Sequence, residues 1–155
     1  MKKTFKLVCC VLIPLIIGGV SGYFTTKNIA TWYVTLIKPS FNPPNYLFGP
    51  VWTTLYVLMG ISLFLVLNKS KELDRNKIIF VFSLQLILNF LWSFIFFEFH
   101  QLGLALIEIV VMWCSILVMI LVFYKTNKWA AYINIPYLLW VSFASVLTYS
   151  IYNLN

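Results

Sequence analysis

The chain has 155 residues, which fits a single domain, and 62% of them are hydrophobic while only 10% are charged. Because about a quarter of the residues in a soluble domain are charged, this chain lacks the side chains to cover a surface in water. The net charge of +7 would by itself suit a nucleic-acid-binding protein. The basic residues, however, lie in short clusters between long apolar runs, as in membrane proteins. We therefore expect the lipid bilayer, and not nucleic acid, to surround the chain.

Five apolar runs are each long enough for a helix to cross the hydrocarbon, which takes about 20 residues. They predict an all-α bundle of five transmembrane helices, near residues 5–25, 47–67, 78–99, 102–124 and 129–152. The runs lack the two-residue alternation of a membrane β-barrel. The first run follows the basic segment MKKTFK and could be a signal peptide. Its length, and the lack of a clear small-x-small cleavage site after it, favour a retained helix.

The basic residues predict how the bundle is oriented, because cytoplasmic loops of membrane proteins are rich in Lys and Arg. One set of loops carries only Lys27 and Lys38. The other side carries nine basic residues: Lys2, Lys3, Lys6, Lys69, Lys71, Arg75, Lys77, Lys125 and Lys128. This difference predicts a cytoplasmic N-terminus and a C-terminus outside the membrane.

The connection at residues 26–46 is long, whereas the other connections are short. It contains Trp32, Tyr33, Pro39, Pro43 and Pro44. Long ordered loops often act as lids or binding elements, and prolines stiffen them. The alternative is an aromatic belt at the membrane interface.

Polar side chains within the predicted helices indicate which faces point into the bundle. Gln85, Asn89 and Ser93 are spaced four residues apart and form one stripe on the third helix. Glu108 is the one acidic residue deep within a run, and either a structural or a functional role is open to it. Gly18 and Gly22 form a GxxxG pair that favours close helix packing within the bundle.

Aromatic residues make up 19% of the chain, more than two interfacial belts need. Trp52 and Tyr56 share a face of the second helix, and Tyr137, Trp140 and Ala144 share a face of the fifth. A pocket with such walls would suit a large planar apolar ligand that carries a few polar groups. The sequence shows no catalytic constellation and no metal-ligand cluster, so we expect neither a metal nor a conventional enzyme.

Three groups of motifs carry a family resemblance. The first is WYVTLIKPSFNPP (32–44) followed by FGPVWTTLYVLMG (48–60). The second is LNFLWSFIFF (88–97) followed by GLALIEI (103–109), and the third is PYLLWVSFASVLTYSIYNLN (136–155). In this order and spacing they resemble the TspO family of translocator proteins, also known as peripheral-type benzodiazepine receptors.

The resemblance implies a five-helix bundle, often a homodimer, with a pocket open towards the first loop. Family members bind porphyrins and other tetrapyrroles, and animal members also bind cholesterol and benzodiazepine-type drugs. We therefore expect a receptor or sensor in a bacterial cell membrane that binds porphyrin as a ligand and requires no cofactor. Positions that match the family pocket are Tyr33, Pro43, Trp52, Tyr56, Asn89, Trp92, Ser93, Trp140 and Ala144.

The resemblance leaves the activity open between three classes of protein: a ligand-binding sensor, an enzyme that degrades porphyrin in light, and a transporter. Trp52 and Trp140 match tryptophans implicated in light-dependent porphyrin degradation by bacterial members, although both could simply shape the pocket. The alternative to a sensor is a transporter of tetrapyrroles or other small hydrophobic molecules. A transporter needs alternating access, and the sequence shows neither an internal repeat nor paired broken helices.

Two departures from the family pattern narrow these expectations. The family's common KPSWxPP reads KPSFNPP here, so Phe41 replaces a tryptophan in the first loop. The C-terminal sterol pattern requires a basic residue after a tyrosine, and none follows Tyr149 or Tyr152. We therefore do not expect this element to recognise sterol.

Overall fold

The computed structural model describes residues 2–155 as a bundle of long helices joined by tight turns and one long loop. Hydropathy and length allow five helical segments to cross a membrane. The predicted all-α fold with five membrane spans is thus confirmed. In chain order the elements are α1 (Lys3–Ile29), the 3₁₀ turn η1 (Tyr33–Thr35), α2 (Asn45–Lys69), α3 (Glu72–Ser93), the π-helical segment η2 (Phe94–Glu98), α4 (Leu102–Thr126), α5 (Lys128–Tyr132) and α6 (Ile135–Leu154).

Most helices extend beyond the apolar runs that predict them. The clearest case is α3, which begins at Glu72 instead of near residue 78. Its first turn contains Glu72 and Asp74, whose negative charges interact favourably with the positive end of the helix dipole. Hydropathy marks only the part of a helix within the hydrocarbon, so polar turns beyond it escape the prediction.

The fifth span is not one continuous helix, as the run at 129–152 predicts, but two. α5 ends at Tyr132 and α6 begins at Ile135. Pro136 lies in the first turn of α6, where its missing N–H is tolerated, whereas a continuous helix would need that N–H. Nδ2 of the Asn134 side chain donates to the backbone carbonyl of Ala130 at 2.9 Å and so stabilises the break between the two helices.

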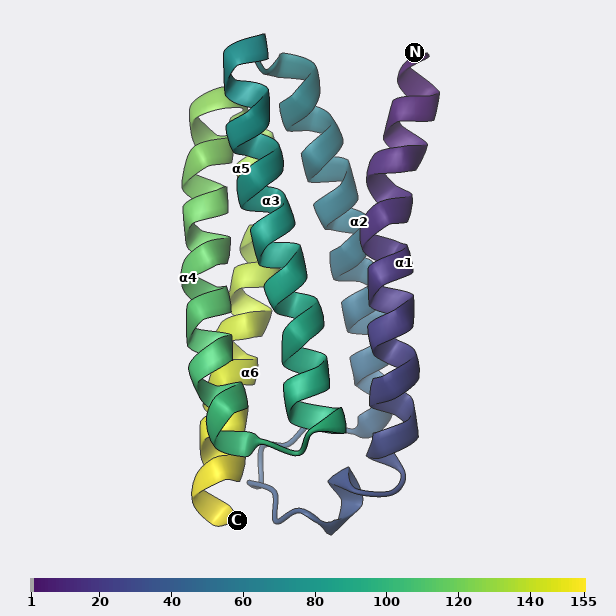
Figure 1. Ribbon diagram of the computed structural model, residues 1–155, viewed down its shortest axis with the longest axis vertical. Helices are drawn as coiled ribbons and strands as arrows, with labels where there is room; N and C mark the ends of the chain where they lie inside the picture. The colour runs from purple at the N-terminus through teal and green to yellow at the C-terminus, as the bar shows by residue number, and fades with distance from the viewer. Residues whose placement is uncertain (1) are drawn as a thin grey trace.

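The connections divide between the two ends of the bundle (Figure 1). The N-terminus, the α2–α3 turn and the α4–α5 turn share one end, drawn at the top. The first loop, the α3–α4 turn and the C-terminus share the other end. The nine basic residues therefore belong to segments that meet at one end, which we call the basic end.

Close contact between α1 and α2 depends on two glycines. A Cβ atom at Gly60 would overlap the backbone of Val11, and one at Gly18 would overlap the ring of Tyr56. Gly22 differs, because a Cβ there would meet no atom within 4 Å. Gly18 therefore serves packing within the bundle, whereas Gly22 faces open space and the two do not act as a pair.

Candidate functional site: an aromatic cavity beside the first loop

A cavity of about 580 Å³ lies within the half of the bundle next to the first loop. Its walls come from α1, the first loop, α2, the junction of α3 with η2, and α6. Its volume falls within the range of about 300–1,000 Å³ that is usual for small-molecule sites. Among the residues that the structure describes, no charged side chain lines it.

Flat aromatic rings form three sides of this cavity. Trp52 and Tyr56 of α2 stack with ring centroids 5.7 Å apart, and Trp92 stacks on Phe96 at 5.1 Å. Trp140 of α6 also lines the cavity and meets Phe48 edge to face at 6.3 Å. These rings hold one another in place and present π surfaces to a ligand.

The remaining side is the small-residue face of α1. Gly19 and Gly22 line the cavity, and a Cβ at either would meet no atom within 4 Å. Ser21 and Thr25 add two short polar side chains to the same wall. Between Gly18 and Thr26, the α1 residues that line the cavity all have small side chains, and this leaves the space that the rings of α2, α3 and α6 surround.

A buried chain of hydrogen bonds holds the hydroxyl end of Tyr56, and the partner residues in this chain do not line the cavity. The Tyr56 hydroxyl donates to Oδ1 of Asn89 at 2.6 Å. Nδ2 of Asn89 donates to the hydroxyl of Tyr137 at 3.0 Å, and that hydroxyl donates to Oε1 of Gln85 at 2.9 Å. α2, α3 and α6 are thereby joined across the bundle, as the predicted polar stripe on α3 requires.

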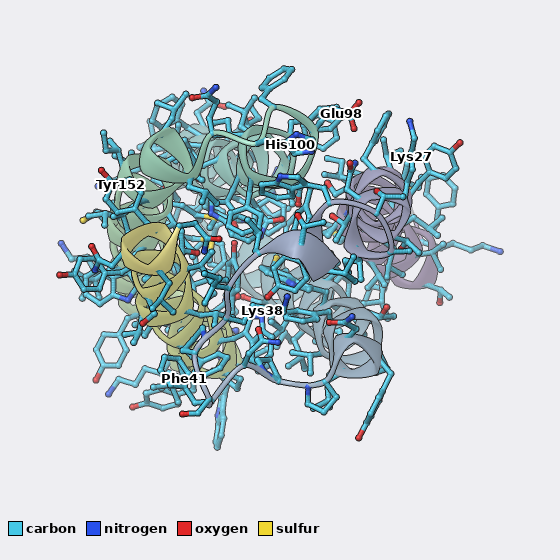
Figure 2. All side chains as sticks on the ribbon, turned by 90° about the horizontal axis from the view of Figure 1, so that it is seen from below. Lys27, Lys38, Phe41, Glu98, His100 and Tyr152 are labelled. Carbon is cyan, nitrogen blue, oxygen red and sulfur yellow. The ribbon has the colours of Figure 1, made fainter. Side chains whose placement is uncertain are left out.

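The first loop closes one end of the cavity through Tyr33, which is 2% exposed. Its hydroxyl donates to Oδ1 of Asn42 at 2.7 Å. Nζ of Lys38 donates to the carbonyls of Tyr33 and Leu36 and lies 5.0 Å from the centre of the Tyr33 ring. Burial raises the pKa of Tyr33 to about 12, so its hydroxyl stays neutral at ordinary pH. Figure 2 shows the loop crossing this end of the bundle, with Lys38 near the centre of the view.

A second set of contacts holds the loop against the α3–α4 turn. The ring of His100 stacks on Trp32 with centroids 4.1 Å apart. Beside this contact, Nδ2 of Asn28 near the end of α1 donates to Oε2 of Glu98 at the end of η2 at 3.0 Å. His100 has a φ of 55°, a left-handed backbone conformation that reverses the chain before α4. The loop is therefore an ordered wall of the cavity, and not only an interfacial belt.

Three polar groups of cavity-lining residues are buried without a hydrogen-bond partner among residues 2–155. They are Nε1 of Trp92, Nε1 of Trp140 and Oγ of Ser21. Leaving such a group unpaired costs about 1–3 kcal/mol, and none of the three atoms presents accessible surface to the cavity, so they lie behind its wall. The hydroxyls of Thr53 and Thr148 differ, because each donates to a carbonyl of its own helix.

The nine pocket residues predicted from the family motifs do not all line the cavity. Asn89 lies behind Tyr56 and is 2% exposed, and Pro43 belongs to the first loop. Neither is among the lining residues. The seven that line it are Tyr33, Trp52, Tyr56, Trp92, Ser93, Trp140 and Ala144.

Several lining residues were not predicted from the sequence. Phe48 and Phe96 lie in the same quoted motifs as Trp52 and Trp92. Counting every aromatic residue of those motifs as a candidate would have included them. Gly22 of α1 gave a packing signal instead, because a GxxxG pair looks the same whether a helix or a cavity faces it, and Ser21 gave no signal in the sequence.

Glu108 lies apart from the cavity. Its side chain is on the buried face of α4, 8% exposed, and neither carboxylate oxygen has a partner within the described part of the chain. No group of three potential metal ligands occurs among residues 2–155. The choice between a structural and a functional role for Glu108 therefore stays as the sequence leaves it.

Comparison with known proteins agrees with the family resemblance. The family model described as "TspO/MBR family" matches residues 10–154. The chain is 40% identical to the "Tryptophan-rich protein TspO" of Chlorobaculum tepidum, over 99% of this chain and 98% of that protein. It is 33% identical to the "Translocator protein" of Homo sapiens, over 80% and 75% of the two chains. It is 32% identical to the "Tryptophan-rich sensory protein" of Cereibacter sphaeroides, over 80% and 77%.

Proposed function

The chain belongs to the TspO/MBR family, a family of membrane sensors and translocators, and on that premise we propose that it is a sensor for porphyrins and related planar hydrophobic ligands. The ligand occupies the aromatic cavity. The basic end of the bundle faces the cytoplasm, so the first loop and the C-terminus lie outside.

One observation carries this proposal. The cavity combines flat aromatic walls, a volume of about 580 Å³ and, among its described residues, a lining without charged side chains. A porphyrin offers a planar macrocycle to stack on these rings. The described lining residues include neither a carboxylate nor a basic group, which favours a ligand whose buried part is uncharged.

Binding is tested by titrating the purified protein with protoporphyrin IX and recording quenching of tryptophan fluorescence. The variant Trp140→Phe keeps an aromatic ring but offers a smaller π surface for stacking, so its affinity should fall about fivefold. The matched control is Trp129→Phe, because Trp129 is 68% exposed and lies outside the cavity lining. Equal affinities for all three proteins would refute the role of the Trp140 indole.

A light-driven reaction is a second candidate activity, and the two tryptophans Trp52 and Trp140 favour it because both line the cavity. An illuminated porphyrin can take one electron from an electron-rich indole that it touches and pass that electron to oxygen, and the indole radical left behind can attack the porphyrin. The double variant Trp52→Phe with Trp140→Phe should then retain measurable binding but degrade bound porphyrin more slowly under light. Degradation at the parent rate would remove these tryptophans from the reaction.

Transport is the third candidate, and its support is the name "Translocator protein" of the human relative. Porphyrin flux across proteoliposomes that contain the purified protein tests it. Flux above that of protein-free vesicles would favour transport, whereas binding without flux favours the sensor.

A further inference from the structure

A second hollow lies at the basic end of the bundle, away from the aromatic cavity. It is a groove of about 320 Å³ between α1, α2 and α3, and it shares no lining residue with the cavity. Its lining residues are Lys6, Cys9, Cys10, Ile13, Leu63, Leu67, Ile79, Phe82, Ser83 and Leu86.

The shape of this groove suits an extended hydrocarbon chain. From Lys6 to Ile13 it follows α1 for about 10 Å, at about 1.5 Å per residue. The small side chains of Cys9 and Ser83 leave room between the helices. Ile13 is 50% exposed and Ile79 48% exposed, so the groove opens towards the lipid that surrounds the bundle.

The mouth of the groove carries a positive charge. Nζ of Lys6 donates to Oδ1 of Asn68 at the end of α2 at 2.9 Å. An ammonium group has three N–H donors, so this bond leaves two for another acceptor. The segments at this end carry nine basic residues and only two acidic ones, Glu72 and Asp74, which lie in the first turn of α3. The surroundings of the mouth therefore attract anions.

We propose that this groove binds one anionic phospholipid, with an acyl chain between α1 and α3 and its phosphate against Lys6. An apolar groove open to the bilayer is filled by lipid chains, so the charge at its mouth decides which headgroup is preferred. Lys and Arg clusters at the cytoplasmic ends of helices attract anionic headgroups by about 1 kcal/mol per residue, which is about fivefold in affinity. The site is independent of porphyrin binding.

The test is native mass spectrometry of the full-length protein released from detergent with phosphatidylglycerol or phosphatidylcholine. The parent should retain one phosphatidylglycerol at least fivefold more tightly than phosphatidylcholine. Lys6→Gln should lose that preference about fivefold, whereas Lys125→Gln, at the same end but outside the groove lining, should keep it. Equal retention of the two lipids by the parent, or an unchanged preference in Lys6→Gln, would overturn the proposal.

A second pair of variants separates the groove from general attraction to the basic end. Ser83→Phe places a ring within the groove without changing its charge, and Ser83 is exposed, so the core is not disturbed. The control Leu84→Phe adds a ring at the neighbouring residue, which is 40% exposed and outside the groove lining. Phosphatidylglycerol retention should fall at least fivefold in Ser83→Phe alone. Retention at the parent level in Ser83→Phe would show that the groove is not the site.

Discussion

Replacing Asn89 with leucine tests how the cavity wall is held. The substitution introduces an apolar side chain of similar size and removes the bonds to Tyr56 at 2.6 Å and Tyr137 at 3.0 Å. Hydrogen bonds between membrane helices are worth about 0.6 kcal/mol on average and up to about 1.7. Tyr137 retains Gln85 as an acceptor, whereas Tyr56 loses its partner. We therefore expect the free energy of unfolding to fall by about 1–3 kcal/mol.

The effect on ligand binding should be smaller and indirect, because Asn89 does not line the cavity. Tyr56 does line it, and its ring gains freedom when the hydroxyl loses its acceptor. The affinity for protoporphyrin IX should fall less than tenfold, which corresponds to about 1.4 kcal/mol. A loss of a hundredfold would mean that Asn89 contacts the ligand directly.

A double-mutant cycle with Tyr56→Phe isolates the bond that carries this effect. The stability of the parent, Asn89→Leu, Tyr56→Phe and the double variant is measured by reversible unfolding in mixed micelles with a denaturing detergent. The double variant should be about 0.5–1.7 kcal/mol more stable than the sum of the single effects predicts, because the bond can be lost only once. Additive effects would refute the bond between these side chains.

Three further predictions concern orientation, packing and pH. In a cysteine-free background, Asn155→Cys should react with an impermeant thiol reagent added outside intact cells, and labelling only after lysis would reverse the orientation. Gly18→Ala should destabilise the bundle, because its Cβ overlaps Tyr56, whereas Gly22→Ala should not; equal unfolding curves in micelles would contradict this packing. Because burial raises the pKa of Tyr33 to about 12 from an ordinary value of 10, the folded chain holds this proton more tightly, so stability should fall as the pH rises from 10 towards 12. Tyr33→Phe should lose less stability over that range, and an identical loss would exclude Tyr33 as the cause.

Hydropathy was sufficient to predict the number and order of the membrane spans, because burial in lipid requires long apolar runs whatever the helices contact. It could not predict the break near Pro136 or the π-helical segment at Phe94–Glu98. Both are local changes in backbone hydrogen bonding that leave the apolar composition unchanged. The position of Pro136 near the start of the run was the one available signal for the break.

The candidate cavity was only partly predictable, because residue spacing defines one helix face but not the neighbour that the face meets. Trp52 and Tyr56 share a face, and that face does line the cavity. Asn89 belongs to a correctly predicted inward stripe, yet it lies one layer behind the wall. Gly22 looked like half of a packing pair, and only its surroundings in the bundle distinguish it from Gly18.

The central claim, that the ligand occupies the aromatic cavity, is tested most directly by filling that cavity from the α1 side. Gly22→Leu should do so without disturbing the fold, because a Cβ at Gly22 meets no atom within 4 Å and the position lines the cavity. The control is Val20→Leu on the same helix, where the side chain is 43% exposed and lies outside the lining. In a protoporphyrin IX titration, Gly22→Leu should bind at least tenfold more weakly than the parent and Val20→Leu equally well. Parent-like affinity in a folded Gly22→Leu variant would contradict the account.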